Sequence, residues 1–147
     1  MEREANGNKH MYIMKPADSS CGKGIKVIGP KTQIMKKTGY VVSQYIANPH
    51  LIDGFKYDLR IYVLCTSFEP MKIFLFREGL VRFATQKYTN NPKMLDKRFI
   101  HLTNYSVNKK ADDYVKSGEN EDENDNASKW NLMQLANWFT ENGVEWN

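Results

Sequence analysis

The sequence predicts an α+β fold in which an antiparallel-rich sheet precedes a C-terminal helix. Three observations support this: short β-like segments occupy the chain as far as residue 84, a glycine-containing loop joins the first two, and helical periodicity appears only near the end. The 147 residues are about the size of one domain. Their 41% hydrophobic and 26% charged fractions are typical of a globular protein.

Six segments are predicted as strands because they are rich in β-branched and aromatic residues. They span residues 10–14, 25–28, 41–46, 59–66, 72–76 and 80–84. Residues 32–37 are predicted as a helical turn. The last two strands flank Arg77-Glu78-Gly79, where the glycine suits a hairpin turn.

A polar, acidic tract follows the strands. Residues 117–128 read SGENEDENDNAS and contain no residue that could build a core, so residues 111–127 are predicted as a flexible acidic loop. Ser128 is then predicted to cap a helix that ends at Gly143. The apolar face of this helix would carry Trp130, Met133, Leu135, Trp138 and Phe139.

The net charge of +4 is unevenly distributed. Residues 112–125 hold seven acidic side chains and one lysine, which leaves 20 basic and 10 acidic side chains elsewhere. Such a field suits nucleic acid, nucleotide phosphates or an acidic polypeptide, and composition alone does not choose among them. A solvated charged surface is the structural alternative.

Several classes of protein are not indicated. No apolar run reaches membrane-spanning length, and the first residues, MEREANGNKH, are too polar for a secretory signal. Cys21 and Cys65 lack metal-ligand spacing and are predicted to be reduced thiols. The three histidines, His10, His50 and His101, are scattered, so no zinc site is predicted.

The stretch KPADSSCGKGIKVIG places Lys15 before a loop that contains two glycines and Lys23. Glycines let backbone N–H groups approach phosphate oxygens, and lysines add positive charge. A surface hairpin turn is the alternative interpretation. A Walker or Rossmann loop leads into a helix, whereas residues 25–28 are β-like, and the catalytic-loop and Asp-Phe-Gly signatures of protein kinases are missing.

The strand that begins near residue 56 carries charges at alternate positions. Because strand side chains alternate between faces, Lys56, Asp58, Arg60 and Tyr62 are predicted to share one face. A row of cation, anion and cation could bind a polyphosphate, a ribose and a metal ion together. The alternative is a solvated face with weak ion pairs. A second basic strand end, residues 77–82, follows within one hairpin.

Four stretches together carry a family resemblance. YIMKPADSSCGKGI, VVSQYIANPHLIDGFKYDLRIYVL, IFLFREGLVRFAT and HLTNYSVNKK resemble the tubulin-tyrosine-ligase-like family, which has an ATP-grasp fold. The acidic insert followed by SKWNLMQL is most similar to the polyglutamylase branch. The resemblance implies a partial ATP-grasp fold that is incomplete at both ends. Residues 1–43 would end the central lid subdomain, and residues 44–147 would begin the C-terminal subdomain.

The resemblance also implies a nucleotide site. The residues expected to bind ATP are Lys15, Cys21, Gly22, Lys23, Gly24, Gln44, Tyr45, Ile46, Lys56, Tyr57, Asp58, Thr103 and Asn104. Within this set, residues 44–46 would contact adenine, and Lys56 and Asp58 would hold adenosine. Many relatives have an arginine where Cys21 stands, which should weaken phosphate contact unless Lys23 compensates.

A second set of positions is assigned to the reaction and to free glutamate. Arg60 would approach the terminal phosphate, and Arg82 would be the second catalytic residue. Arg82, Tyr105, Ser106 and Lys129 match the positions that bind free L-glutamate. The implied reaction uses ATP and Mg²⁺ to convert a glutamate carboxylate of a tubulin C-terminal tail to an acyl phosphate. The amine of free glutamate then attacks it, giving an isopeptide branch.

The family holds magnesium on a later strand that carries Asp and then Glu-Val-Asn, and this pattern is not found within residues 1–147. No metal ligand is therefore predicted within the chain, Asp58 is the one strong acidic candidate, and these residues alone are expected to be inactive. The implied partners are tubulin tails and microtubules, without nucleic acid or membrane. The implied location is the cytoplasm and the microtubule cytoskeleton, including cilia or basal bodies.

Three alternatives remain open. The chain could be a non-catalytic nucleotide- or tubulin-binding remnant, or belong to a tubulin glycylase or another ATP-grasp ligase. A nucleic-acid-binding domain rests on charge alone, because Phe74, Phe76 and Phe83 are predicted as core residues and not as stacking platforms.

Overall fold

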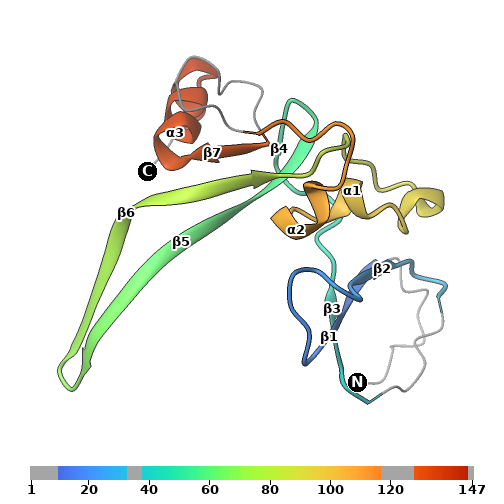
Figure 1. Cartoon of the computed structure of the whole chain (residues 1–147), viewed down its shortest axis with the longest axis horizontal. Helices are drawn as coiled ribbons and strands as arrows, with labels where there is room; N and C mark the ends of the chain where they lie inside the picture. Colours follow the sequence, from blue (N-terminus) through green and yellow to red (C-terminus); the bar gives the residue numbers. More distant parts are fainter. Residues whose placement is uncertain (1–9, 33–37, 117–127, 146–147) are drawn as a thin grey trace.

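The computed structural model describes residues 10–32, 38–116 and 128–145. The chain forms a first antiparallel sheet and then most of a second one, three short helical segments follow, and a longer helix comes after the last strand (Figure 1). The predicted α+β class, with antiparallel sheets and a C-terminal helix, is confirmed. In the part of the chain that the structure describes, no helix has the length and apolar character needed to span a membrane.

The first sheet has three strands in the order β2-β1-β3. Its members are β1 (Tyr12–Pro16), β2 (Lys26–Ile28) and β3 (Tyr40–Gln44), so the predicted strands over 10–14, 25–28 and 41–46 are confirmed with shifted ends. β1 and β2 form the predicted glycine-loop hairpin, and the loop places Cys21 and Gly22 at positive φ. The helical turn predicted over 32–37 falls almost wholly outside the described residues.

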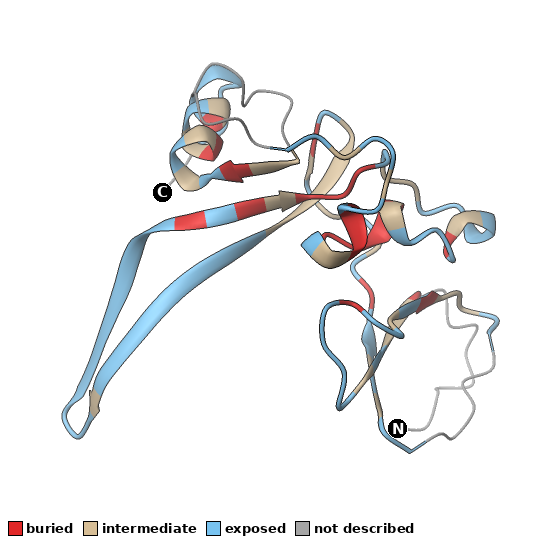
Figure 2. Ribbon diagram, in the orientation of Figure 1, coloured by how far each residue is buried: buried red, intermediate tan, exposed pale blue. Residues whose placement is uncertain are grey.

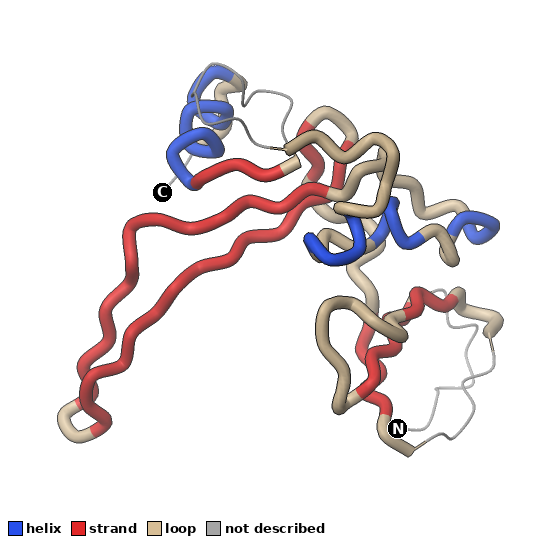
Figure 3. Tube along the Cα trace, in the orientation of Figure 1, coloured by secondary structure: helices blue, strands red, loops and turns tan. Residues whose placement is uncertain are grey.

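The second sheet has four strands in the order β4-β5-β6-β7. They are β4 (Leu51–Ile52), β5 (Phe55–Phe68), β6 (Met71–Phe83) and β7 (Lys129–Asn131). The distal halves of β5 and β6 form a two-stranded arm that extends away from the other elements (Figure 3). The proximal halves pair with β4 and β7.

The hairpin turn predicted at Arg77-Glu78-Gly79 is wrong. Residues 71–83 form one strand, and the turn lies instead at Glu69-Pro70, between β5 and β6. Gly79 pairs with Ile61, and a Cβ at this position would lie 2.6 Å from the Arg60 carbonyl oxygen. The glycine therefore permits a close backbone approach within a strand, which the sequence pattern does not distinguish from a turn.

The prediction that Phe74 and Phe76 are core residues is also wrong for the described chain. Their exposed fractions are 58% and 60%, because both lie on the arm beyond the part of the sheet that a helix covers (Figure 2). Phe83, at the proximal end of β6, is buried as predicted.

The C-terminal helix begins later than predicted. α3 (Leu132–Glu141) is capped by Asn131, whose side chain accepts from the Gln134 backbone N–H while the Gln134 side chain accepts from the Asn131 N–H. The predicted cap, Ser128, accepts instead from the Val115 N–H. Pairing with β6 holds residues 129–131 extended, so the helix starts after them.

The apolar face predicted for this helix is confirmed in part. Leu135 and Phe139 are buried, and Trp138 packs partly buried against the same core. Trp130 belongs to that core as a residue of β7, whereas Met133 is exposed. The core, completed by Ile52, Val81 and Phe83, fixes one face of the second sheet under α3.

Three short helical segments follow the arm: η1 (Pro92–Met94), α1 (Arg98–His101) and α2 (Tyr105–Asn108). Leu95, after η1, packs with Met11, Val27 and Tyr45 and so joins this region to the first sheet. Residues 111–116 form a loop, and the rest of the predicted acidic loop, residues 117–127, lies outside the described residues.

Candidate functional site

The charged face of the second sheet lies opposite α3. Phe55 and Tyr57 pack into the core on the α3 side, so the alternation of β5 directs Lys56 and Asp58 to the other face. Lys56 reaches across to the end of the first sheet, where its Nζ donates to the Tyr45 hydroxyl at 3.0 Å and to the His101 carbonyl oxygen at 3.0 Å. The predicted row of side chains therefore begins where the two sheets meet.

Lys56 is held in an environment that disfavours its charge. Burial lowers the pKa of Lys56 to about 8. The negative charge of Asp58 raises this pKa, and the positive charge of Lys15 lowers it further. Lys15 comes from β1, Lys56 from β5, and the sequence separates them by some forty residues. Two predicted nucleotide-binding lysines are thus close enough to repel each other.

The glycine loop is docked against α2. A Cβ on Gly22 would lie 2.9 Å from Asn104 Oδ1, and the Ser106 hydroxyl donates to the Cys21 carbonyl oxygen at 2.7 Å. Arg98 donates from Nη2 to the Gly22 carbonyl oxygen at 2.6 Å. Three predicted sites, the loop, Asn104 and Ser106, are therefore brought together.

A second group of predicted residues gathers around Arg82. Asp58 lies opposite Arg82 across β5 and β6, and Lys129 lies opposite Arg82 across β6 and β7. Arg82 donates from Nε to Asp58 Oδ1 at 2.8 Å and from Nη2 to Asp58 Oδ2 at 2.5 Å. The hydrogen bond to Asp58 raises the pKa of Arg82. The Lys129 ammonium lies 5.0 Å from the centre of the Tyr105 ring.

Other predicted residues lie apart from these groups. The Gln44 amide contacts His10, and the Ile46 side chain is 73% exposed. The Tyr57 hydroxyl meets His50 on the α3 side of the sheet, away from Lys56. Arg60, two residues after Asp58 on β5, and Lys23, in the glycine loop, belong to elements already described and are exposed to solvent.

Thr103 and Asn104 are positioned by a buried asparagine. Asn108, which is 1% exposed, donates from Nδ2 to the Leu102 and Asn104 carbonyl oxygens. Its Oδ1 accepts from the backbone N–H and the hydroxyl of Thr85. The segment that contains Thr103 and Asn104 is thereby tied to the end of β6.

Sequence reasoning missed His101 and Arg98. In the sequence, His101 is one of three scattered histidines, and its available signal is that it begins the HLTNYSVNKK stretch and follows the apolar pair Phe99-Ile100. It is 2% exposed and contacts Tyr45 and Met94. No local sequence pattern indicates the role of Arg98, because its hydrogen-bond partner, Gly22, is 76 residues away in the chain.

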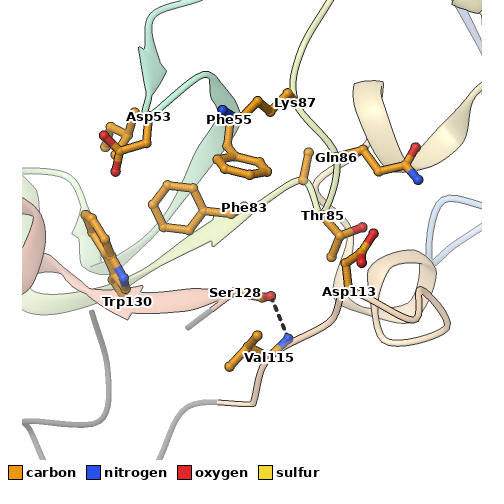
Figure 4. A pocket seen from close by; sticks show the side chains of 12 residues that line it. Asp53, Phe55, Phe83, Thr85, Gln86, Lys87, Asp113, Val115, Ser128 and Trp130 are labelled. Atoms are coloured by element: carbon orange, nitrogen blue, oxygen red, sulfur yellow. Dashed lines mark hydrogen bonds between the residues drawn. The ribbon is translucent and has the colours of Figure 1, made fainter. Parts of the chain in front are cut away.

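A cavity of about 570 Å³ lies beside the core residues of the second sheet, on the face opposite Lys56 and Asp58 (Figure 4). Its lining includes Phe55, Phe83, Thr85, Asp113 and Trp130, and no lining residue belongs to the predicted site. The Trp130 indole N–H, beside this cavity, has no hydrogen-bond partner among the described residues. A second cavity, of about 400 Å³, includes Gly24 and His101 in its lining. Neither cavity is lined by Lys56, Asp58 or Arg60.

The residues present fit a polyanion better than a metal ion. Lys56 is a partly buried cation near the charge of Lys15, and it has a third N–H donor beyond those given to Tyr45 and His101. Within residues 10–32, 38–116 and 128–145, no group of three or more His, Cys, Asp or Glu side chains could hold a metal ion. Asp58, the acidic candidate for magnesium, is engaged by Arg82.

Comparison with known proteins gives the relationship independently. The family model described as "Tubulin-tyrosine ligase family" matches residues 1–147. Tubulin polyglutamylase TTLL5 of Mus musculus is 46% identical over 134 residues, which cover 91% of this chain and 10% of the relative. Tubulin monoglutamylase TTLL4 of Mus musculus is 44% identical over 140 residues, covering 95% of this chain and 12% of the relative.

Probable tubulin polyglutamylase TTLL2 of Homo sapiens is 39% identical over 150 residues, covering 99% of this chain and 24% of that protein. The chain therefore spans between a tenth and a quarter of the length of these relatives. The match over its whole length shows that the chain belongs to the tubulin-tyrosine ligase family.

Proposed function

We propose that the protein carrying this chain is an ATP-dependent ligase that adds glutamate to glutamate side chains in the C-terminal tails of tubulin. The names of the similar proteins, which are tubulin polyglutamylases and a monoglutamylase, support this substrate. The single structural observation that carries the proposal is the junction of the two sheets, where partly buried Lys56 is held by the Tyr45 hydroxyl and the His101 carbonyl oxygen and feels the charge of Lys15. The proposed place of action is the microtubule cytoskeleton.

The nucleotide phosphates are assigned to this junction, so Lys56 is given a phosphate contact in place of the adenosine contact that the resemblance implies. A polyphosphate placed between Lys15 and Lys56 would relieve their mutual repulsion, so binding would be favoured by more than the two contacts alone. The glycine loop follows Lys15 along the chain, is held by Arg98 and by Ser106 of α2, and would offer backbone N–H groups to the phosphates. In this arrangement residues 1–43 supply the lid, and residues 44–147 supply the sheet beneath the nucleotide.

Free glutamate is assigned to the group around Arg82. Arg82 holds Asp58 with Nε and one hydrogen of Nη2, which leaves Nη1 and the second Nη2 hydrogen for a carboxylate. Lys129, on the neighbouring strand, adds a second positive charge. Cations at this position would hold the carboxylates of the incoming amino acid while its amine faces the reacting centre.

The chemistry that these residues must assist is amide formation. A carboxylate resists attack by an amine, and transfer of a phosphoryl group from ATP converts it to an acyl phosphate that the amine can attack, releasing phosphate. Phosphoryl transfer depends on positioning and on charge neutralisation. Lys15, Lys56 and Arg60 would contribute that charge. Magnesium would neutralise further phosphate charge when bound, but the described residues do not form a site for it.

The test is ATP-dependent incorporation of labelled glutamate into tubulin by the protein that carries this chain. We expect incorporation that requires ATP and is lost in Lys56→Ala. Omission of ATP, and removal of the tails from tubulin by limited proteolysis, are the controls. Incorporation that persists without ATP, or that does not depend on Lys56, would contradict the proposal.

A further inference from the structure

Tyr45, His101 and Lys56 form a connected chain of hydrogen bonds. The Tyr45 hydroxyl lies 3.1 Å from His101 Nδ1 and 3.0 Å from Lys56 Nζ. His101 Nε2 lies 3.1 Å from the Met94 carbonyl oxygen. The three side chains come from the residue that follows β3, from α1 and from β5.

The chemistry of the partners fixes the direction of each bond. A carbonyl oxygen only accepts, so His101 must carry its proton on Nε2 to donate to Met94. An ammonium only donates, so the Tyr45 oxygen accepts from Lys56. If His101 is neutral, its Nδ1 accepts and the Tyr45 O–H donates to it, which leaves every group in the chain satisfied.

The surroundings favour neutral His101. Burial lowers the pKa of His101, and the Lys56 charge lowers it further, while the Met94 carbonyl and Asp96 act in the opposite direction. Tyr45 and Tyr88 both pack edge-on against the imidazole ring and stay protonated because burial raises the pKa of each hydroxyl.

We propose that His101 and Tyr45 act as a positioning relay that aims the Lys56 ammonium at the phosphates of the bound nucleotide. The inference rests on the proposed function, because it assigns supports to a lysine of that site. His101 fixes the orientation of the Tyr45 hydroxyl, and the hydroxyl fixes the ammonium together with the His101 carbonyl. Lys56 is thus held from two sides before any ligand arrives.

The two groups that accept hydrogen bonds from Lys56, the Tyr45 hydroxyl and the His101 carbonyl oxygen, are neutral. Neutral acceptors can orient the ammonium without cancelling its charge. A carboxylate would hold Lys56 more tightly but would also cancel the charge that a phosphate requires. The carboxylate in reach, Asp58, is turned to Arg82 instead. A hydroxyl and a carbonyl orient Lys56 and leave its charge available. Such fixed positioning lowers the entropy that binding must overcome.

The test measures ATP affinity by isothermal titration in the protein that carries this chain. We expect Tyr45→Phe and His101→Phe each to weaken binding by about tenfold, the size of one hydrogen bond to a charged group. Because both act through Lys56, the double variant should be no worse than either single variant, and neither should matter in a Lys56→Ala background. His50→Phe is the matched control, since it removes another Tyr–His contact of 3.1 Å on the opposite side of the sheet.

A pH series separates positioning from general destabilisation. The Tyr45 hydroxyl accepts from the charged form of Lys56, so its removal should lower the pH at which ATP binding is lost, while His50→Phe should leave that pH unchanged. Thermal unfolding of each variant shows that it is folded. Additive losses, or an unmoved pH dependence, would overturn the relay. Binding that is unaffected by Lys56→Ala would overturn the nucleotide assignment itself.

Discussion

Asp58 and Arg82 face each other in register across β5 and β6, and their side chains form a two-point ion pair on the face opposite α3. One residue was predicted to hold the nucleotide and the other the free glutamate. The pair therefore links the two proposed binding regions through a single contact. The Arg82 side chain is 17% exposed and the Asp58 side chain 39%, so solvent screening keeps the contribution of the pair to stability small.

We expect the pair to matter for transfer more than for folding. Asp58→Ala should leave the Arg82 guanidinium without its orienting partner and raise the KM for glutamate, while the free energy of unfolding changes by less than about 1 kcal/mol.

Arg82→Ala should abolish transfer of glutamate and leave ATP binding largely intact. Arg82→Lys should also fail, because an ammonium cannot hold two carboxylates bidentately. Glutamate-dependent kinetics and ATP titration measure the two effects, and unchanged transfer in Arg82→Ala would refute the assignment.

ATP affinity should fall as the pH rises through about 8. The pKa of Lys56 is lowered from 10.5 to about 8, so its ammonium is lost progressively as the pH rises through that value. Titration from about pH 7 to about pH 9 at constant ionic strength should show the decrease, and Lys56→Arg should flatten it because arginine stays protonated. A flat profile in the unaltered protein would show that Lys56 charge does not contribute.

The lowered pKa of Lys56 also predicts that the stability of the fold rises with pH, whereas ATP affinity falls. Below pH 8 the folded state carries a partly buried ammonium at an unfavourable cost. Between pH 8 and 10.5 the folded state releases this proton while the unfolded chain keeps it, so the contribution of Lys56 to the free energy of unfolding becomes more favourable as pH rises. Denaturant unfolding of Lys56→Met, which should lack this trend, is the comparison.

Arg98 should control the glycine loop. Its guanidinium donates to the Gly22 carbonyl oxygen, so Arg98→Ala removes a charged hydrogen bond and should weaken ATP binding by up to about tenfold. Limited proteolysis at residues 17–24 should become faster in the same variant. Lys97→Ala is the control, because it removes a neighbouring exposed cation whose side chain makes no capping hydrogen bond at the start of α1. Equal effects of both substitutions would indicate a general loss of charge.

The sequence was most informative where a local pattern decides the structure. Alternation along β5 placed Lys56 and Asp58 on one face, and the glycine loop between β1 and β2 followed from its composition. Contacts between distant segments were not accessible in this way. The Arg98–Gly22 and Tyr45–His101 contacts join segments 76 and 56 residues apart, and no local pattern encodes them.

The start of the C-terminal helix shows the same limit. Trp130 fits a helical pattern and a strand equally well, and pairing with Val81 decides in favour of β7. Asn131 then becomes the cap in place of Ser128. The helix is present as predicted, but pairing of residues 129–131 with β6 delays its start to Leu132.

Gly79 provides a direct test of the long strand β6. It lies opposite Ile61, and a Cβ there would meet the Arg60 carbonyl oxygen at 2.6 Å and Leu132 Cδ1 at 3.0 Å. Gly79→Ala should therefore push β5, β6 and α3 apart and lower the free energy of unfolding by about 2 kcal/mol, as overpacking does in other cores. Gly29→Ala is the matched control, because the nearest atom to its Cβ would be Leu95 Cδ1 at 3.4 Å and its φ is not positive. If residues 77–79 formed an exposed turn instead, alanine at 79 would be tolerated as well as at 29, and denaturant unfolding of the two variants distinguishes these outcomes.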